Sequence, residues 1–313
     1  MKKTVHPYRT VLLLGNKKRH GVPEVLEKLV PQIAELYDIV DTDYSGTRDM
    51  SKIKVDFAIV FGGDGSLIRA FHQLGPNQVP LLAVHLGSLG FLSSTSSEEL
   101  IPLLKRPDFS EFSIRHQILL ECSLFRKRSQ LTPENRKALD LPDQGEGDPD
   151  EEFCISKRLV VNEVALRGGS PFQILKIELL VDGDSVTTYH GDGLIISTPV
   201  GSTAHCLSAG GPILRKDLNA VVICPLNPHT LSNRPVIDGA SREYELRVRN
   251  PNVFVVIDGE VDTTIGPGDR VLINQAPFTC KMIRIPGKSY YRSIREKLGW
   301  GGCIEGMENK VNR

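Results

Sequence analysis

The chain has 313 residues, a length that suggests two domains of about 150 residues each. Its 38 Lys and Arg residues balance 38 Asp and Glu residues, so the formal net charge is zero, which argues against a dedicated nucleic-acid-binding protein. Hydrophobic residues make up 40% of the chain and charged residues 24%, as in globular proteins and unlike disordered or fibrous ones.

The sequence indicates neither a secretion signal nor a membrane span. Lys2 and Lys3 are followed only by the short apolar run Val11–Leu14. The longest charge-free stretch, Gly193–Leu214, is too rich in Gly, Pro, Ser and Thr for a membrane helix. The six cysteines contain no CxxC pair, which favours free thiols over a zinc or disulfide framework. We therefore expect a cytoplasmic protein.

The first third of the chain predicts strands that alternate with helices. Apolar runs predict strands, and apolar residues at helical spacing predict helices; in chain order these are a strand at 11–14, a helix at 23–37, a strand at 55–61, a helix at 67–74 and a strand at 79–84. Ser96 and Glu99 form a capping-box signature before a further helix at 100–104. This alternation favours an α/β domain with an open, mostly parallel sheet over residues 1–108.

The pattern then changes to short β-like runs separated by turns. These runs are 117–125, 158–166, 172–181, 193–197, 220–224, 243–248, 253–257, 270–273 and 278–285. We expect a larger, β-rich C-terminal domain over 109–286, with the active site in the cleft between the two domains. A short helix at 292–300 is expected in the tail, 287–313, which should pack back on the first domain.

A charged segment at about 126–152 interrupts the second domain. It begins with the basic stretch Arg126–Lys137 and ends with Asp143–Glu152, which holds six acidic residues and no basic one. Such a composition predicts an exposed, mobile insertion of low order. A regulatory or contact role is the alternative.

Gly62-Gly63-Asp64-Gly65-Ser66 follows an apolar strand and opens a helix. The glycines would let backbone amides approach phosphate oxygens, and the helix N-terminus would add partial positive charge. A carboxylate would repel phosphates there unless Asp64 accepts a proton from an attacking hydroxyl or helps to hold Mg²⁺. The alternative is a tight turn in which Asp64 caps the helix.

Two further motifs contain candidate binding residues. Asn162-Glu163 interrupts the apolar run Leu159–Leu166, and the pair either grips sugar hydroxyls or is a polar pair on an edge strand. The many small residues from Gly191 to Pro212 indicate backbone packed closely around something, or else a structural β-corner.

Together these motifs resemble the NAD kinase family. The motifs occur in the order of that family: Gly62–Ser66, Leu86–Phe91, Asn162-Glu163, Gly191–Leu194, Ser197–Ala204, Ser208–Pro212, Pro228–Pro235 and Asp258-Gly259. The resemblance runs from about Val11 to Trp300 without the 126–152 insertion. The GGDG motif alone is shared with 6-phosphofructokinases and with diacylglycerol and sphingosine kinases. The combination of GDG, STPxGSTA and SAGGP is far more specific.

The resemblance implies transfer of the terminal phosphoryl group of ATP, or of polyphosphate, to the 2′-hydroxyl of the adenosine ribose of NAD, giving NADP. Mg²⁺ would enter with the nucleotide phosphates, with Asp64 as a further candidate ligand, and the chain would form a homodimer or homotetramer. The implied catalytic residue is Asp64, and the implied phosphate-binding residues are Gly62, Gly63, Gly65 and Ser66. The implied dinucleotide-binding residues are Phe91, Asn162, Glu163, Asp192, Thr203, Ala204, His205 and Ser208.

Two positions depart from the family pattern. His205 stands where the family commonly has a Tyr that covers the dinucleotide base, and Ser66 stands where it usually has Thr.

Two other functions remain as alternatives. One is a sugar or lipid kinase that uses the same GGDG loop, and the other is a pseudokinase that binds NAD(H) without turnover. The intact Asp64 and Asn162-Glu163 argue against the pseudokinase.

Overall fold

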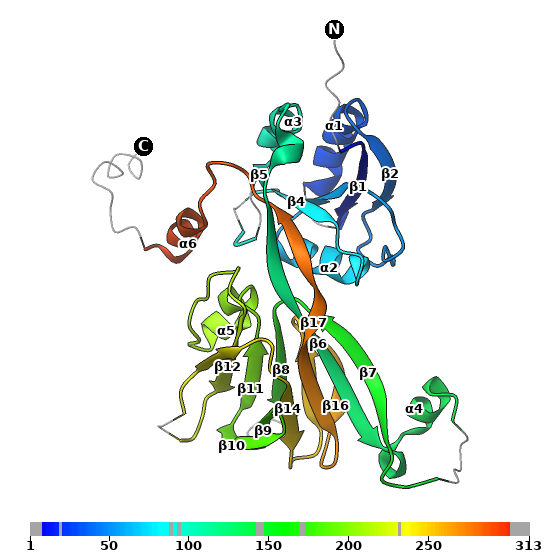
Figure 1. Ribbon diagram of the computed structural model, residues 1–313, viewed down its shortest axis with the longest axis vertical. Coiled ribbons are helices and arrows are strands. Elements are labelled where there is room, and N and C mark those ends of the chain that lie inside the picture. The colour runs from blue at the N-terminus through cyan, green and yellow to red at the C-terminus, as the bar shows by residue number, and fades with distance from the viewer. Residues whose placement is uncertain are drawn as a thin grey trace. The chain divides into compact units, whose positions relative to one another are not determined.

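The computed structural model describes residues 8–18, 21–87, 90–92, 95–141, 147–169, 173–230 and 233–300 (Figure 1). The chain divides into two compact units. The first contains the chain up to His116 and again from Cys280, and the second contains Gln117–Thr279. Two long strands, β6 (Ile114–Lys127) and β17 (Arg270–Ile283), continue from one unit into the other.

The first unit is an α/β domain around a parallel sheet. Its strands are β1 (Thr10–Gly15), β2 (Asp38–Asp43), β3 (Phe57–Phe61), β4 (Pro80–His85) and the short β5 (Thr95–Ser96). Its helices are α1 (Val22–Ala34), α2 (Asp64–Leu74), α3 (Ser97–Leu104), the 3₁₀ turn Phe109–Glu111 and α6 (Tyr290–Leu298). The end of β17 joins the sheet, whose order is β17-β4-β3-β1-β2 with parallel neighbours throughout. The predicted open, mostly parallel sheet is confirmed.

The inner strands β1, β3 and β4 of this sheet are buried on both faces, as the continuous apolar runs predict for parallel strands. Val11 and Leu13 pack in one cluster with apolar residues of α1 and α3, while the alternate residues Leu12 and Leu14 are equally inaccessible to solvent. At the start of α3, Ser96 Oγ accepts a hydrogen bond from the Glu99 amide, which confirms the predicted capping box. This packing fixes the carboxyl ends of β3 and β4, where the glycine-rich loops begin.

The C-terminal helix α6 belongs to the first unit. Just before it, Lys288 Nζ donates to both carboxylate oxygens of Glu99, at 2.7 and 3.0 Å. Among the described residues no helix is both long and apolar enough to cross a membrane.

The second unit is built from two antiparallel sheets. The first sheet contains β6, β7 (Glu152–Val160), β9 (Leu175–Val181), β10 (Asp184–Gly191), β14 (Tyr244–Val248) and β17. The second contains β8 (Glu163–Gly168), β11 (Gly193–Ser197), β12 (Ala220–Leu226), β13 (Val236–Gly239), β15 (Val253–Ile257) and β16 (Glu260–Ile265), in the order β13-β12-β11-β8-β15-β16. Apolar side chains from both sheets form one shared core. The prediction of a β-rich domain is confirmed, although 270–273 and 278–285 form the single strand β17.

The predicted strand 158–166 is wrong in one important respect. The chain leaves β7 at Val160 and begins β8 at Glu163, and these two strands belong to different sheets. Val161 and Asn162 therefore form a corner at which the backbone crosses between the sheets. The polar pair Asn162-Glu163 lies at this corner and not within a continuous edge strand.

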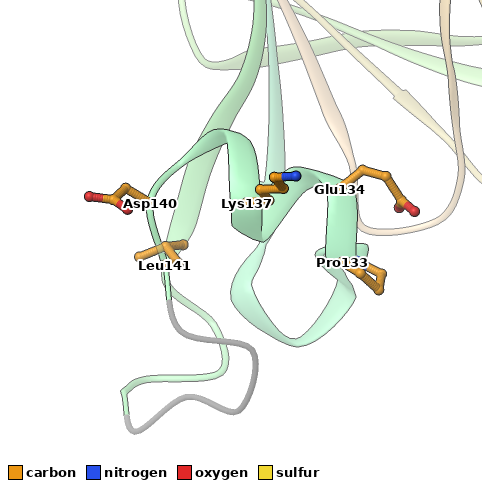
Figure 2. A pocket seen from close by; sticks show the side chains of 5 residues that line it. All are labelled: Pro133, Glu134, Lys137, Asp140 and Leu141. Carbon is orange, nitrogen blue, oxygen red and sulfur yellow. The ribbon is translucent and has the colours of Figure 1, made fainter.

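The described part of the 126–152 insertion contains regular secondary structure, which its composition did not predict. β6 extends to Lys127, a 3₁₀ turn covers Arg128–Gln130, and α4 spans Pro133–Ala138. Arg126 forms a bidentate ion pair with Asp269 and also donates to Asn135 of α4, which anchors the helix. Residues 142–146 lie outside the described residues. Figure 2 shows an open hollow beside α4 whose labelled side chains spread outward without meeting at one point, so no ligand site is indicated there; they are Pro133, Glu134, Lys137, Asp140 and Leu141.

Replacing residues 139–149 with a short Gly-Ser linker is expected to leave turnover within a few-fold of the original. The linker keeps the ion pairs Lys127–Asp150 and Arg128–Glu151, which close the end of the β6–β7 hairpin. Steady-state kinetics and the thermal unfolding midpoint measure the outcome. A large loss of turnover in a variant that unfolds at the original temperature would make the insertion a functional element.

Candidate functional site

The GGDG loop connects the carboxyl end of β3 to the first turn of α2. The Gly62 amide donates to Val84 O at 2.9 Å, which ties the loop to β4. Gly62 has φ 144°, a conformation that other residues rarely adopt. Gly63 precedes the helix without a side-chain cap, and Ser66 is buried in its first turn. The loop therefore presents a helix N-terminus at a sheet edge, the arrangement that binds phosphate groups.

Asp64 is the first residue of α2, and its carboxylate holds the loop that follows β4. Its Oδ2 accepts a hydrogen bond from the Phe91 amide at 2.8 Å, and its Oδ1 accepts one from the Leu92 amide at 3.0 Å. The structure thus brings Asp64 and Phe91 together, although Ser88 and Leu89 of the same motif lie outside the described residues. Each carboxylate oxygen has a second lone pair available for a further donor. Asp64 can therefore anchor this loop and also accept a proton.

The residues around Asp64 fit a metal that enters with a nucleotide. Among the described residues no group of three or more His, Cys, Asp or Glu side chains is placed to hold a metal ion. Mg²⁺ is commonly held by one or two carboxylates together with substrate phosphates and water. A single carboxylate at a helix start, which favours phosphate groups, is compatible with that pattern.

The corner at Asn162 is tightly packed by the small-residue segment that follows β11. Thr198 N donates to Asn162 O at 2.8 Å, and Thr198 Oγ1 donates to Val161 O at 2.6 Å. A Cβ added to Gly201 would lie 2.2 Å from Asn162 O. The small residues are therefore required because two backbone segments approach each other closely. Asn162 and Glu163 are both buried beneath this segment.

Asp258 ties the same corner to the β15–β16 hairpin. Asp258 and Gly259 form its two-residue turn, both at positive φ, as a type I′ hairpin requires. The Asp258 carboxylate accepts hydrogen bonds from three consecutive amides of the corner, those of Val161, Asn162 and Glu163. Asp258-Gly259 is part of the family motif pattern, but the sequence predicts no role for it in the site. Only its Asp-Gly turn signal was visible in the sequence.

Glu163 carries the most perturbed carboxyl group of the corner. Its residue is 4% exposed, and its Oε2 atom has no hydrogen-bond partner within the described part of the chain. Burial, and then the negative charge of Asp258, raise the pKa of Glu163 to about 8. The carboxyl group is therefore mainly protonated at neutral pH.

The other predicted dinucleotide residues are spread along the second unit. Thr203 and Ala204 follow the corner segment, with Thr203 Oγ1 donating to Val200 O, and Ser208 ends the short helix α5 (His205–Ser208). Asp192 is exposed and accepts a hydrogen bond from Asn227 Nδ2 at 2.8 Å. It precedes β11, whereas Glu163 pairs with Ser197 at the far end of that strand, so about 16 Å of strand separate them. Within one chain, Asp192 and Asn162-Glu163 do not converge.

His205 begins α5 and is partly buried. Burial, and then the positive charge of Arg167, lower the pKa of His205 below its usual 6.5. The imidazole ring is therefore neutral at pH 7 and presents a flat, uncharged face. This state suits stacking on a base.

Replacing His205 with Ala is expected to raise the KM for NAD more than it lowers kcat, because stacking acts in both the ground state and the transition state. Replacing it with Tyr is expected to preserve activity, since a larger ring covers more of a base. Steady-state kinetics with NAD as the varied substrate measure both changes. An unchanged KM in the Ala variant would place His205 outside the pocket.

Family models match both units of the chain. Residues 12–107 match the ATP-NAD kinase N-terminal domain, and residues 161–285 match the ATP-NAD kinase C-terminal domain. A NAD kinase from Rhodopirellula baltica is 40% identical over 296 residues, which cover 94% of this chain and 88% of the relative. The chain belongs to the NAD kinase family. As a NAD kinase it is a phosphotransferase, and the β6–β7 arm with α4 falls outside both matched regions.

Solved structures share the fold of this NAD kinase. A yeast NADH kinase, solved in complex with NADH, aligns with a TM-score of 0.77 at 20% identity, covering 97% of this chain and 91% of its own. An NAD kinase from Archaeoglobus fulgidus, solved in complex with ATP, aligns with a TM-score of 0.67 at 21% identity, covering 94% of this chain and 100% of its own. These similarities confirm the predicted fold class.

Proposed function

We propose that this NAD kinase transfers the terminal phosphoryl group of ATP to the 2′-hydroxyl of the adenosine ribose of NAD, giving NADP. The main support is the position of Asp64, a carboxylate at the start of α2, where backbone amides of the helix N-terminus favour phosphate oxygens. The solved relatives were crystallised with NADH and with ATP, which supports both substrates.

In the proposed mechanism the first unit supplies the phosphate-binding loop. Phosphoryl transfer requires charge neutralisation and alignment more than covalent catalysis. Gly62, Gly63, Gly65 and Ser66 would bind the donor phosphates, and Mg²⁺, when bound, would neutralise them. Asp64 would accept the proton of the ribose 2′-hydroxyl while the hydroxyl oxygen bonds to the terminal phosphorus of ATP and ADP departs as the leaving group.

The second unit would bind the dinucleotide. Asn162 and Glu163 are held at the corner by Asp258 and by the segment from Thr198 to Gly201. Thr203, Ala204 and His205 follow directly and would line the base pocket. Asp192 and Ser208 are proposed as further contacts on the dinucleotide.

Assembly and location are proposed on separate grounds. The family resemblance supports a homodimer or homotetramer, and we expect a second copy over the exposed apolar residues Val186, Val236 and Ile237 of edge strands β10 and β13. The five described cysteines are free thiols, which supports a reducing compartment such as the cytoplasm.

The deciding experiment offers the purified chain ATP or polyphosphate together with NAD, NADH, fructose 6-phosphate or diacylglycerol. NADP formation from NAD and ATP is the expected result. Phosphorylation of the sugar or the lipid instead of NAD would assign a different kinase. Calorimetric binding of NAD without NADP in any donor mixture would identify a pseudokinase.

A further inference from the structure

Two carboxyl groups with different surroundings meet at the Asn162 corner. The Asp258 carboxylate accepts three backbone hydrogen bonds, from the amides of Val161 at 2.9 Å, Asn162 at 2.6 Å and Glu163 at 3.1 Å. Its own amide donates to Glu163 O at 3.0 Å. Several amide donors favour the charged form of a carboxyl group. Asp258 therefore provides the ionised carboxylate of the corner.

Glu163 has the opposite surroundings. Its side chain is almost wholly buried, and its Oε2 atom is enclosed without a partner among the described residues. No ion pair involving Glu163 occurs in the described part of the chain. An unpaired buried charge is far more costly than an unpaired neutral group, and the Asp258 charge adds repulsion. The neutral acid is therefore the form of Glu163 that has the lower free energy in the folded chain.

We infer that Asp258 is a positioning residue that holds the backbone of Asn162 and Glu163, and that Glu163 meets the dinucleotide as an uncharged carboxylic acid. This inference rests on the proposed binding of NAD at these residues. A neutral acid both donates and accepts hydrogen bonds, whereas a carboxylate only accepts. It also adds no second negative charge near a ligand that carries an anionic pyrophosphate.

The charge of Glu163 is one of the causes that raise the pKa of Cys206 in α5. A hydrogen bond with Cys224, then burial, raises the pKa of the Cys206 thiol well above its usual range, so Cys206 remains a thiol. The same hydrogen bond lowers the pKa of Cys224 from its usual 9.0, so Cys224 is a second group whose ionisation must be separated from that of Glu163. Cys224→Ser is therefore the matched control for a pH effect assigned to Glu163.

The first experiment measures the affinity for NAD by calorimetry between about pH 6 and about pH 9. The unmodified chain is expected to bind with constant affinity at low pH and to lose affinity above about pH 8, approaching about tenfold per pH unit. Glu163→Gln, which cannot ionise, is expected to remove this pH dependence and to lose less affinity at neutral pH than Glu163→Ala. Cys224→Ser is expected to keep the pH dependence.

The second experiment needs no ligand. Folding raises the pKa of Glu163 from 4.5 to about 8, so the folded chain binds this proton more tightly than the unfolded chain. The protonated Glu163 contributes fully to the free energy of unfolding below pH 4.5, and this contribution is lost as the pH rises to about 8. The thermal unfolding midpoint of Glu163→Gln should therefore exceed that of the unmodified chain by an amount that grows over this range.

The role of Asp258 is tested with Asp258→Asn. This change removes the charge that is the second cause of the raised pKa of Glu163, so the loss of NAD affinity should move to lower pH. The KM for NAD should rise more than kcat falls, because the change loosens the backbone of the binding pair. If Asp258→Asn does not fold, Glu163→Gln decides the inference.

Two results would overturn the inference. One is an affinity that increases with pH in the unmodified chain, together with a Glu163→Gln variant that binds as poorly as Glu163→Ala; the carboxylate would then be the binding form. The other is an unfolding midpoint difference that does not grow with pH. If the proposed function itself fails, NAD binding will not respond to Asn162→Ala or Glu163→Ala, and the unfolding experiment alone decides the protonation state.

Discussion

Replacing Asp64 with Asn is expected to lower kcat by about 10²–10⁴-fold, the range typical of lost general-base catalysis, while NAD still binds. The structure adds a second consequence. Both Asp64 oxygens accept amide hydrogen bonds, from Phe91 and Leu92, and Asn offers only one acceptor oxygen. We therefore also expect a loss of stability of about 1–3 kcal/mol from one unmatched amide. Coupled NADP assays, NAD titration and thermal unfolding measure the three quantities.

Asp56 supplies the matched control for the effect of anchoring. Its Oδ2 atom accepts hydrogen bonds from the amides of Arg9 and Thr10 at 2.7 and 2.8 Å, so Asp56→Ala, which removes this acceptor, also loosens a loop of the first unit. This control should lose stability and keep its turnover. Near-normal turnover in Asp64→Asn would falsify the assignment of Asp64 as the proton acceptor and would move the search to Glu163 and Asp192.

Replacing Gly201 with Ala is expected to weaken NAD binding at least about tenfold, or ~1.4 kcal/mol. The added methyl group would lie 2.2 Å from Asn162 O and 2.6 Å from Ser197 Oγ. The first of these is a backbone atom, so the Asn162 corner itself must move. Overpacking of this kind also costs about 1–3 kcal/mol of stability.

Gly239 offers a matched control in the same unit. The nearest atom to a Cβ at Gly239 is Ser241 Oγ at 4.0 Å, so Gly239→Ala meets no steric conflict. Calorimetric titration with NAD and thermal unfolding of both variants separate a local displacement from a general effect of Ala. Equal NAD affinity in Gly201→Ala and the unmodified chain would show that the corner does not contribute to binding.

The sequence was sufficient where a local pattern determines the structure. Continuous apolar runs predict strands buried on both faces, and the positions of Val11–Leu14 and Phe57–Phe61 confirm this. Gly62–Ser66 follows such a strand and opens a helix, so its place at the carboxyl end of the sheet was predictable. The capping box at Ser96 was predictable for the same reason, because its partners are three residues apart.

The sequence was insufficient where the structure depends on distant partners. The polar pair Asn162-Glu163 interrupts the apolar run Leu159–Leu166 but carries no turn signal, and only tertiary hydrogen bonds from Thr198 and to Asp258 turn the run into a corner between sheets. In the insertion, α4 is too short for a periodic signal, and its anchor Asp269 lies 143 residues from Arg126. Burial of Glu163, and hence its raised pKa, follows from these same distant contacts.

The separation between Asp258 and the corner has a consequence for the order of biosynthesis. Asp258 lies 95 to 97 residues after the three residues whose amides donate hydrogen bonds to its carboxylate. The ribosome therefore adds Asp258 long after Asn162 and Glu163 have been made. A nascent chain that ends before the β15–β16 hairpin can form local turns but cannot lock this corner. Contacts of such long sequence separation also form late in folding, because they require closure of a large loop. The corner geometry that we propose for dinucleotide binding therefore forms only after the β15–β16 hairpin has been made, and a translation product that ends before this hairpin is expected not to bind NAD.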